Sequence, residues 1–240
     1  FIYSVTAIYY PRMSTLWNKD DKQGYKKSVS EIILMISYFL IPATVGLILL
    51  RFNVIDLTSK WTNFSDESAY IAGNLLGCYG LGIVFIGLKE ILDKAFYAQK
   101  STKPSAVIGI VIMATNVIVS FLLKDKLGTY CMPIAYSVSS LVGSLCLFIY
   151  LIKKIGNFSK EIYINMLKCL ISACIMGIVV NLFRNYLTNL YFINEIMDRL
   201  LKLLIPVFFG VVTYFLSTLV LKVGISRVVV DRCLSFFKRR

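Results

Sequence analysis

Long apolar segments alternate with short polar connections along the whole chain. Six of the apolar segments hold about 20 residues, and a helix of that length matches a hydrocarbon core of about 30 Å. The first segment holds only ten residues and opens within an apolar run, so we expect it to be the tail of a helix. The segments are Phe1–Tyr10, Ile32–Leu50, Ala69–Leu88, Ser105–Leu123, Cys131–Ile152, Ile162–Phe183 and Leu203–Leu221. The pattern predicts an all-α, polytopic transmembrane helix bundle with about seven membrane segments, one of them truncated at the N-terminus.

Basic residues favour every second connection between these segments. If the odd-numbered connections lie inside, 19 of the 26 Lys and Arg residues are inside and 7 are outside. The 13 Asp and Glu residues divide as seven and six, so only the cations are biased. This asymmetry is what the positive-inside rule describes, and it predicts a multi-pass protein with a cytoplasmic C-terminus. We therefore expect the net charge of +13 to reflect topology and anionic membrane lipids, and no nucleic acid.

The residue inventory argues against an enzyme. The chain is 58% hydrophobic and 16% charged, and it contains no His. No Asp or Glu lies in the middle of an apolar segment, where proton relays and membrane-embedded catalytic groups need ionisable side chains. The six Cys residues show no paired spacing that would indicate a zinc site or a disulfide framework. We expect no catalytic residue and no metal ligand.

Four polar residues are candidates for a substrate path. Asn116 and Ser120 lie one helical turn apart and share a face, and Asn74 lies within the third apolar segment. An amide in lipid needs partners, so these groups either join helices or line a cavity that touches a polar headgroup or an ion. Lys89 closes the third segment. The spacing there offers two (i, i+4) ion pairs, Lys89–Asp93 and Glu90–Lys94. The ammonium of Lys89 either extends to the membrane surface or attracts an anionic phosphate in a cavity.

The connection after the third segment carries a more specific pattern. Phe96-Tyr97-Ala98 comes after the basic residues that end the third predicted membrane helix. A polar turn then leads to Thr102-Lys103-Pro104. Tyr10-Pro11-Arg12 ends the first apolar segment. Together these stretches resemble the signature of MurJ/MviN-type lipid II flippases, as helices eight (end) to fourteen of that family. The residues that carry the resemblance are Pro11, Arg12, Phe96, Tyr97, Lys103 and Pro104.

The resemblance implies a two-lobed transporter with fourteen helices in the bacterial cytoplasmic (inner) membrane. Such a flippase moves a polyprenyl-diphosphate-linked saccharide lipid to the outer leaflet by alternating access. Residues 1–152 would be the C-terminal transport lobe, with the N-terminal lobe missing and required as a partner. Residues 153–222 would form two additional C-terminal transmembrane helices, and residues 223–240 a basic cytoplasmic tail.

The resemblance also bears on the driving force. Some members of the family hold sodium with an Asn and an Asp one turn apart on helix eleven. Here Ser120 follows Asn116 at that spacing, so the carboxylate is missing and sodium binding is in doubt. No other cofactor is implied, and the membrane potential is a candidate driving force.

Three alternatives to a lipid II flippase stay open at this point. A flippase of the same superfamily could carry another lipid-linked oligosaccharide, such as a capsule, teichoic or spore-wall precursor. A non-transporting membrane scaffold of cell-wall synthesis could use the basic inner connections to recruit enzymes. A membrane-embedded glycosyl- or acyltransferase is disfavoured by the missing His and deep carboxylates.

Overall fold

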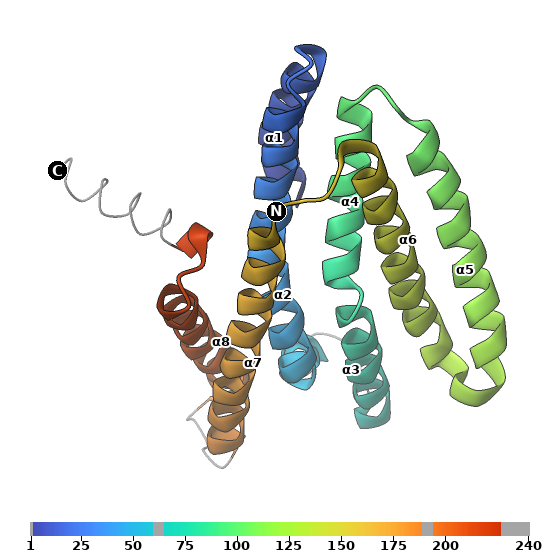
Figure 1. Ribbon diagram of the computed structural model, residues 1–240. Helices are drawn as coiled ribbons and strands as arrows, with labels where there is room; N and C mark the ends of the chain where they lie inside the picture. The colour runs from blue at the N-terminus through green and yellow to red at the C-terminus, as the bar shows by residue number, and fades with distance from the viewer. Residues whose placement is uncertain (1, 60–64, 189–193, 227–240) are drawn as a thin grey trace. The chain divides into compact units, whose positions relative to one another are not determined.

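The computed structural model describes residues 2–59, 65–188 and 194–226, and these residues contain helices and no strand (Figure 1). The helices are α1 (Ile2–Asn18), α2 (Lys22–Ser59), α3 (Asp66–Gly80), α4 (Ile83–Ala98), α5 (Lys103–Leu127), η1 (Gly128–Tyr130), α6 (Cys131–Ile155), α7 (Lys160–Thr188) and α8 (Glu195–Val220). The all-α prediction is therefore confirmed. Most of the predicted tail lies outside the described residues.

The chain divides into two compact units. Unit 1 comprises residues 1–40 and 81–163, and unit 2 comprises residues 41–80 and 164–240. The first division falls inside α2, next to Pro42, and the second falls where α3 gives way to α4. This division follows spatial contacts rather than chain order, so the predicted transport lobe, extra helices and tail stay predictions.

In unit 1, α5 and α6 form a helical hairpin that packs through α6 onto α4 (Figure 1). The chain reverses at Gly128, whose φ of +51° is open to glycine at no steric cost. Small residues on α6 let α5 approach closely: a Cβ on Gly143 would lie 2.3 Å from the Ile112 side chain. Ala135 and Ser139, at fourfold spacing from Gly143, are fully buried. Lipid tails are as apolar as helix side chains, so the hydrophobic effect does not drive helices together in a membrane. Close packing of this kind drives their association instead.

In unit 2, a second face of small residues packs against the later part of α2. A Cβ on Gly73 would meet the Phe52 ring, and one on Gly77 would meet the Arg51 side chain. α8 packs on α7, where the rings of Phe183 and Phe209 stack with centroids 4.2 Å apart. Both helix pairs therefore include close packing contacts.

The third predicted apolar segment, Ala69–Leu88, is wrong as a single helix. α3 ends at Gly80 and α4 begins at Ile83. The α6 backbone passes close to this break, because a Cβ on Gly82 would lie 3.2 Å from the Cα of Ser137. Glycine also has low helix propensity, so Gly80 and Gly82 favour an interruption here.

The helices also extend beyond the apolar segments that predict them. Pro11 lies inside α1, and only three residues separate α1 from α2, so the polar connection expected between the first two apolar segments is mostly helical. Likewise, α8 begins at Glu195, eight residues before the predicted segment. Polar residues are excluded from the hydrocarbon region but not from a helix, so hydropathy locates the membrane and not the helix ends.

Four stretches of the described residues are long and apolar enough to cross a membrane, or up to five when α3 and α4 count as one broken span. One of these stretches, Lys103–Ile155, contains both α5 and α6, which pack against each other. The chain is thus a multi-pass membrane helix bundle. The count of about seven crossings stays a prediction.

Candidate functional site

The C-terminal end of α4 is built as a tight, specific turn. The Ser101 N–H donates to the Phe96 carbonyl at 3.1 Å, and the Lys100 N–H donates to the Tyr97 carbonyl at 2.9 Å. Lys100 adopts a left-handed φ of +56°, which completes a Schellman motif. Pro104 then lies in the first turn of α5, where a proline is tolerated because the first helical N–H groups have no partner within the helix.

Two adjacent aromatic residues on this turn point to different surroundings. Phe96 is fully buried, and its ring lies 5.6 Å from that of Tyr150 on α6. Tyr97 is 37% exposed. Phe96 therefore anchors α4 to α6, while Tyr97 is free to contact a ligand.

A buried tyrosine on α2 holds the same turn. The Tyr25 hydroxyl donates to the Ala95 carbonyl at 2.7 Å and accepts from the Gln99 amide at 2.9 Å. Tyr25 is fully buried, and its ring meets the edge of Trp17 at 5.1 Å. No sequence pattern predicts this contact, because Tyr25 lies in a polar, Lys-rich connection 70 residues from its partner.

Beside Tyr97 lies a groove of about 420 Å³ between α1 and α4, both in unit 1. Four positions on one face of α1, spaced as i, i+3, i+4 and i+7, form one wall. Two positions one turn apart on α4 form the other. The lining residues are Tyr3, Thr6, Ala7, Tyr10, Lys94 and Tyr97.

Lys94 is half-buried, and its Nζ lies 5.6 Å from the centre of the Tyr97 ring. No carboxylate among the described residues forms an ion pair with it, so the expected Glu90–Lys94 pair is absent there. The groove therefore combines one ammonium group with three tyrosines, and neither α1 nor Lys94 was singled out from the sequence for this role.

Lys89, the main candidate from the sequence, is held by two carboxylates. Its Nζ lies 2.9 Å from Asp93 Oδ2 and 3.4 Å from Glu90 Oε1. The predicted Lys89–Asp93 pair is thus confirmed. Asp93 is buried, and its second oxygen has no hydrogen-bond partner within the described part of the chain. The ammonium of Lys89 is already neutralised, whereas that of Lys94 is not.

The other candidates from the sequence are dispersed. The Asn116 amide on α5 lies 3.5 Å from the Ser139 hydroxyl on α6, a long contact that fits a link between helices. Ser120 is half-buried one turn further along α5, and Asn74 is half-buried on α3 in unit 2. A substrate path through Lys89, Asn74, Asn116 and Ser120 therefore stays a prediction.

The remaining motif residues lie within α1 and at the start of α5, both in unit 1. Arg12 forms an ion pair with Glu31 at 3.0 Å, joining α1 to α2, and its motif neighbour Pro11 lies inside α1. Lys103 is exposed at the start of α5, beside buried Pro104. Arg12 therefore joins two helices, Pro104 lies in the first turn of α5, and none of the four lines the groove.

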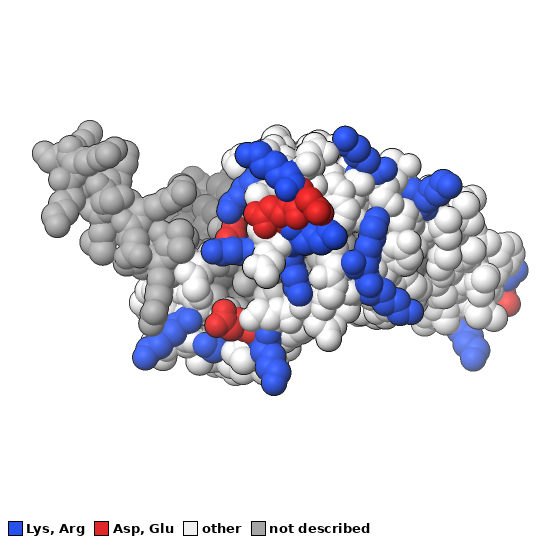
Figure 2. Space-filling model, turned by 45° about the horizontal axis from the view of Figure 1, so that its top comes forward, with Lys and Arg blue, Asp and Glu red and all other residues white. Residues whose placement is uncertain are grey.

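Three connections predicted to lie inside meet at one end of unit 1. Tyr25 contacts Gln99, and Lys154 at the end of α6 lies 5.8 Å from the Trp17 ring. Figure 2 shows Lys and Arg side chains gathered over the surface that comes forward when the top of Figure 1 is tilted toward the viewer. Helix ends that the charge bias assigns to one membrane side thus lie together, as that assignment requires.

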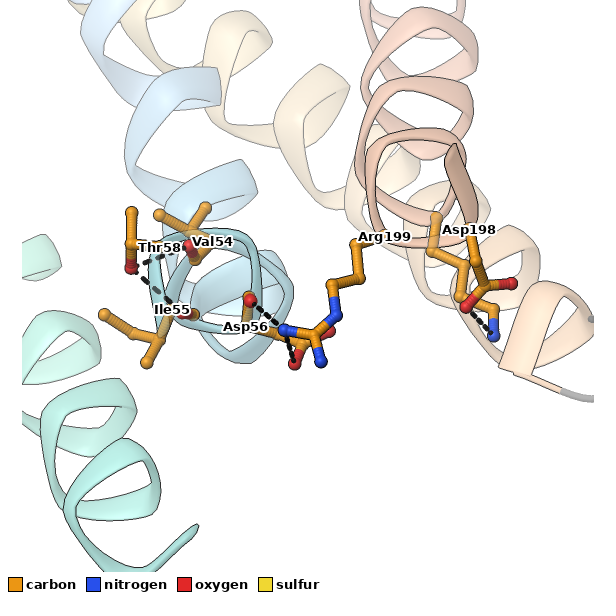
Figure 3. Close-up of polar contacts among 7 residues, drawn as sticks. Val54, Ile55, Asp56, Thr58, Asp198 and Arg199 are labelled. Carbon is orange, nitrogen blue, oxygen red and sulfur yellow. Dashed lines mark hydrogen bonds and ion pairs between the residues drawn. The ribbon is translucent and has the colours of Figure 1, made fainter. Parts of the chain in front are cut away.

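At the other predicted membrane side, unit 2 has its own polar contacts. Figure 3 shows Arg199 reaching from α8 to the end of α2. Its Nη1 donates to the Asp56 carbonyl at 2.7 Å and lies 3.2 Å from the Asp56 carboxylate. Arg184 on α7 donates to the Leu49 carbonyl at 2.9 Å. Arg199 thus joins the start of α8 to the end of α2, and Arg184 joins α7 to the interior of α2. No cluster of three His, Cys, Asp or Glu suited to a metal occurs in the described ranges.

A family model described as "Lipid II flippase MurJ" matches residues 1–202. The lipid II flippase MurJ of Thermosipho africanus (strain TCF52B) is 24% identical over 216 residues, which are 90% of this chain and 41% of the relative. The probable lipid II flippase MurJ of Aquifex aeolicus (strain VF5) is 27% identical over 71% of this chain and 33% of the relative. A solved structure titled "Lipid II flippase MurJ, inward closed conformation" has a TM-score of 0.73 at 23% identity, covering 92% of this chain and 43% of that one. The chain spans less than half the length of these relatives, and the structural likeness shows the fold.

Proposed function

Because the chain belongs to the family of the lipid II flippase MurJ, we propose that it takes part in moving a polyprenyl-diphosphate-linked saccharide across the cytoplasmic membrane. The proposal makes the protein a transporter rather than an enzyme. The observation that carries it is the family match over residues 1–202 of a chain with several membrane-spanning helices. Lipid II, the lipid-linked precursor of peptidoglycan, is the substrate that we propose first.

The physical problem that such a protein solves is the cost of moving a charged headgroup through hydrocarbon. Transferring an ionised group without a partner from water into an apolar medium costs several kcal/mol or more, whereas the apolar polyprenyl tail dissolves there without this cost. Ammonium groups at the end of α4 and hydroxyl groups in the adjoining groove can replace part of the headgroup's hydration. The groove would receive the headgroup, and the lipid phase the tail.

Several properties of the whole protein belong to the same proposal. Alternating access requires two lobes that move against each other, so we propose that an N-terminal lobe completes the transporter. The membrane potential, worth about 2.3 kcal/mol per charge at 100 mV, favours outward movement of an anionic headgroup and could drive export. Sodium coupling is not proposed, because Ser120 takes the place of the expected carboxylate. The C-terminus is proposed to be cytoplasmic.

Depletion and rescue test this function. A strain whose own lipid II flippase can be depleted would receive the complete gene that contains this sequence. We expect growth to recover, together with exposure of lipid II on the outer leaflet, measured by its cleavage with an added enzyme that cannot enter the cell. An unrelated membrane protein that does not transport lipids, expressed to the same level, is the control.

The outcome separates the alternatives. Unrestored lipid II exposure, with normal amounts of protein in the membrane, would reject the lipid II assignment. Recovery of another lipid-linked saccharide in a strain that lacks its exporter would then identify that substrate. Restored growth without restored exposure would favour a scaffold of cell-wall synthesis.

A further inference from the structure

We propose that the groove between α1 and α4 binds the diphosphate-saccharide headgroup of a polyprenyl lipid, with Lys94 on the diphosphate and the tyrosines on the sugar. The inference rests on the proposed function and adds a specific site to it. The site lies wholly within unit 1, because α1 and the groove-lining part of α4 both belong to that unit.

The charge of the groove favours an anion. Lys94 is half-buried and contacts the Tyr97 ring, and no ion pair to a carboxylate within the described ranges neutralises it. A cation over an aromatic ring keeps most of its hydrogen-bonding capacity, because the ring offers no acceptor atom. The three donors of this ammonium are thus available for phosphate oxygens. Lys89, only five positions away, is already paired with two carboxylates and is the poorer candidate.

The tyrosines make the groove suited to a saccharide rather than to an acyl chain. Tyr3, Tyr10 and Tyr97 are 74%, 38% and 37% exposed. Each offers an apolar ring face and a hydroxyl group that can donate or accept, which matches the alternating C–H and O–H groups of a sugar. The volume of about 420 Å³ falls within the range of small-molecule sites.

The wall of the groove is held in place by the contacts already described. Tyr25 fixes the backbone at Ala95, between Lys94 and Tyr97 in sequence. Phe96 packs against Tyr150 and so directs its neighbour Tyr97 away from α6. The Schellman turn then ends α4 at this point. The side chains of Lys94 and Tyr97 are therefore presented from a rigid helix end.

Equilibrium binding to the full chain in phosphatidylcholine nanodiscs tests the site. The probe is undecaprenyl-diphosphate-linked disaccharide pentapeptide, with phosphatidylglycerol as the anionic comparison. We expect Lys94→Ala and Tyr97→Ala each to weaken probe binding about tenfold, the loss of one charge-assisted or stacking contact. Lys94→Arg should retain most of the affinity. Lys153→Ala, an exposed lysine at the end of α6, is the matched control and should bind as the unchanged chain does.

A second measurement does not depend on removing any groove side chain that carries the argument. A photoreactive benzoylphenylalanine at Ala7, which lines the groove, should crosslink to the probe. The same residue at Ile8, which is 74% exposed and outside the groove lining, should not. Equal crosslinking at both positions would overturn the site even if a groove variant failed to fold.

The outcomes separate this site from the proposed function. If the chain binds the probe and the Lys94 and Tyr97 variants bind it equally well, the site is wrong and the proposed function stands. If phosphatidylglycerol competes as well as the probe does, the groove is a general anionic-lipid site and the saccharide assignment is wrong. If the chain shows no affinity for the probe, the site is wrong, and the depletion and rescue experiment alone decides the proposed function.

Discussion

The hydroxyl of Tyr25 donates a 2.7 Å hydrogen bond to the carbonyl of Ala95, across 70 residues of chain. This bond ties the first turn of α2 to the last turn of α4, next to the residues that carry the family motif. The backbone N–H of Gln99, which would bond the Ala95 carbonyl in a continuing α-helix, donates instead to the Phe96 carbonyl. The Tyr25 hydroxyl therefore supplies the donor that the Ala95 carbonyl lacks at this helix end. The contact therefore positions both Phe96 and Tyr97.

Tyr25→Phe should destabilise unit 1 by about 1–3 kcal/mol, because it removes the donor to Ala95 and the acceptor for the Gln99 amide in a buried site. Thermal unfolding in detergent, followed by tryptophan fluorescence of nearby Trp17, measures the change. Tyr163→Phe, at a 44% exposed tyrosine, is the control and should leave the midpoint unchanged. Equal midpoints for both variants would contradict a structural role for the bond.

Lys89→Ala should lower rescue of a flippase-depleted strain. A second substitution separates a loss of protein stability from a loss of substrate contact. The variant leaves buried Asp93 without its ion-pair partner, which costs about 3–5 kcal/mol in a fully buried pair and less here, because the Lys89 side chain is 30% exposed. Lys89→Ala with Asp93→Asn should recover protein stability. Recovered stability without recovered rescue would place Lys89 in the substrate path, and recovery of both would make it structural.

Gly82→Ala should destabilise the contact between the start of α4 and α6 by about 1–3 kcal/mol. The added Cβ would lie 2.9 Å from Ser137 Oγ and 3.2 Å from its Cα, and the backbone atom cannot move aside as a side chain can. Gly109→Ala is the matched control, because nothing lies within 4 Å of a Cβ there and alanine is the better helix former. Unfolding midpoints of the two variants should therefore shift in opposite directions.

A double-mutant cycle tests whether Asn116 joins α5 to α6. The 3.5 Å separation of the Asn116 amide and the Ser139 hydroxyl predicts a coupling energy of about 0.6 kcal/mol between Asn116→Ala and Ser139→Ala. Transport should be unaffected if the amide only links helices. Loss of transport with unchanged stability would instead assign Asn116 to the substrate path.

Arg199→Ala should loosen the start of α8 with little effect on global stability, since the contact with Asp56 is partly exposed and such pairs contribute about 0–1 kcal/mol. Hydrogen exchange should become faster at residues 195–201, and not on α7. Arg199→Lys keeps the charge but loses the planar, two-contact geometry, so its exchange should be intermediate. Unchanged exchange in Arg199→Ala would mean that contacts other than the one with Asp56 hold the start of α8.

The sequence predicted the candidate site unevenly, for a physical reason. Lys89–Asp93 was predictable because partners four residues apart on a helix must be neighbours. Phe96 and Tyr97 were identified by resemblance, but their opposite surroundings were not, since both are aromatic and adjacent. Lys94 was expected to pair with Glu90, and the fold instead places its ammonium over Tyr97.

The amino-acid sequence by itself determined that this protein is a multi-pass helix bundle, because hydrocarbon accepts only long apolar helices and the charge bias orders their ends. It also determined the small-residue faces, since fourfold spacing places them on one side of a helix whatever packs there. The tertiary structure alone decided which partner meets each face and where glycine interrupts a span. Those outcomes depend on contacts between helices distant in sequence, and a local pattern carries no record of them.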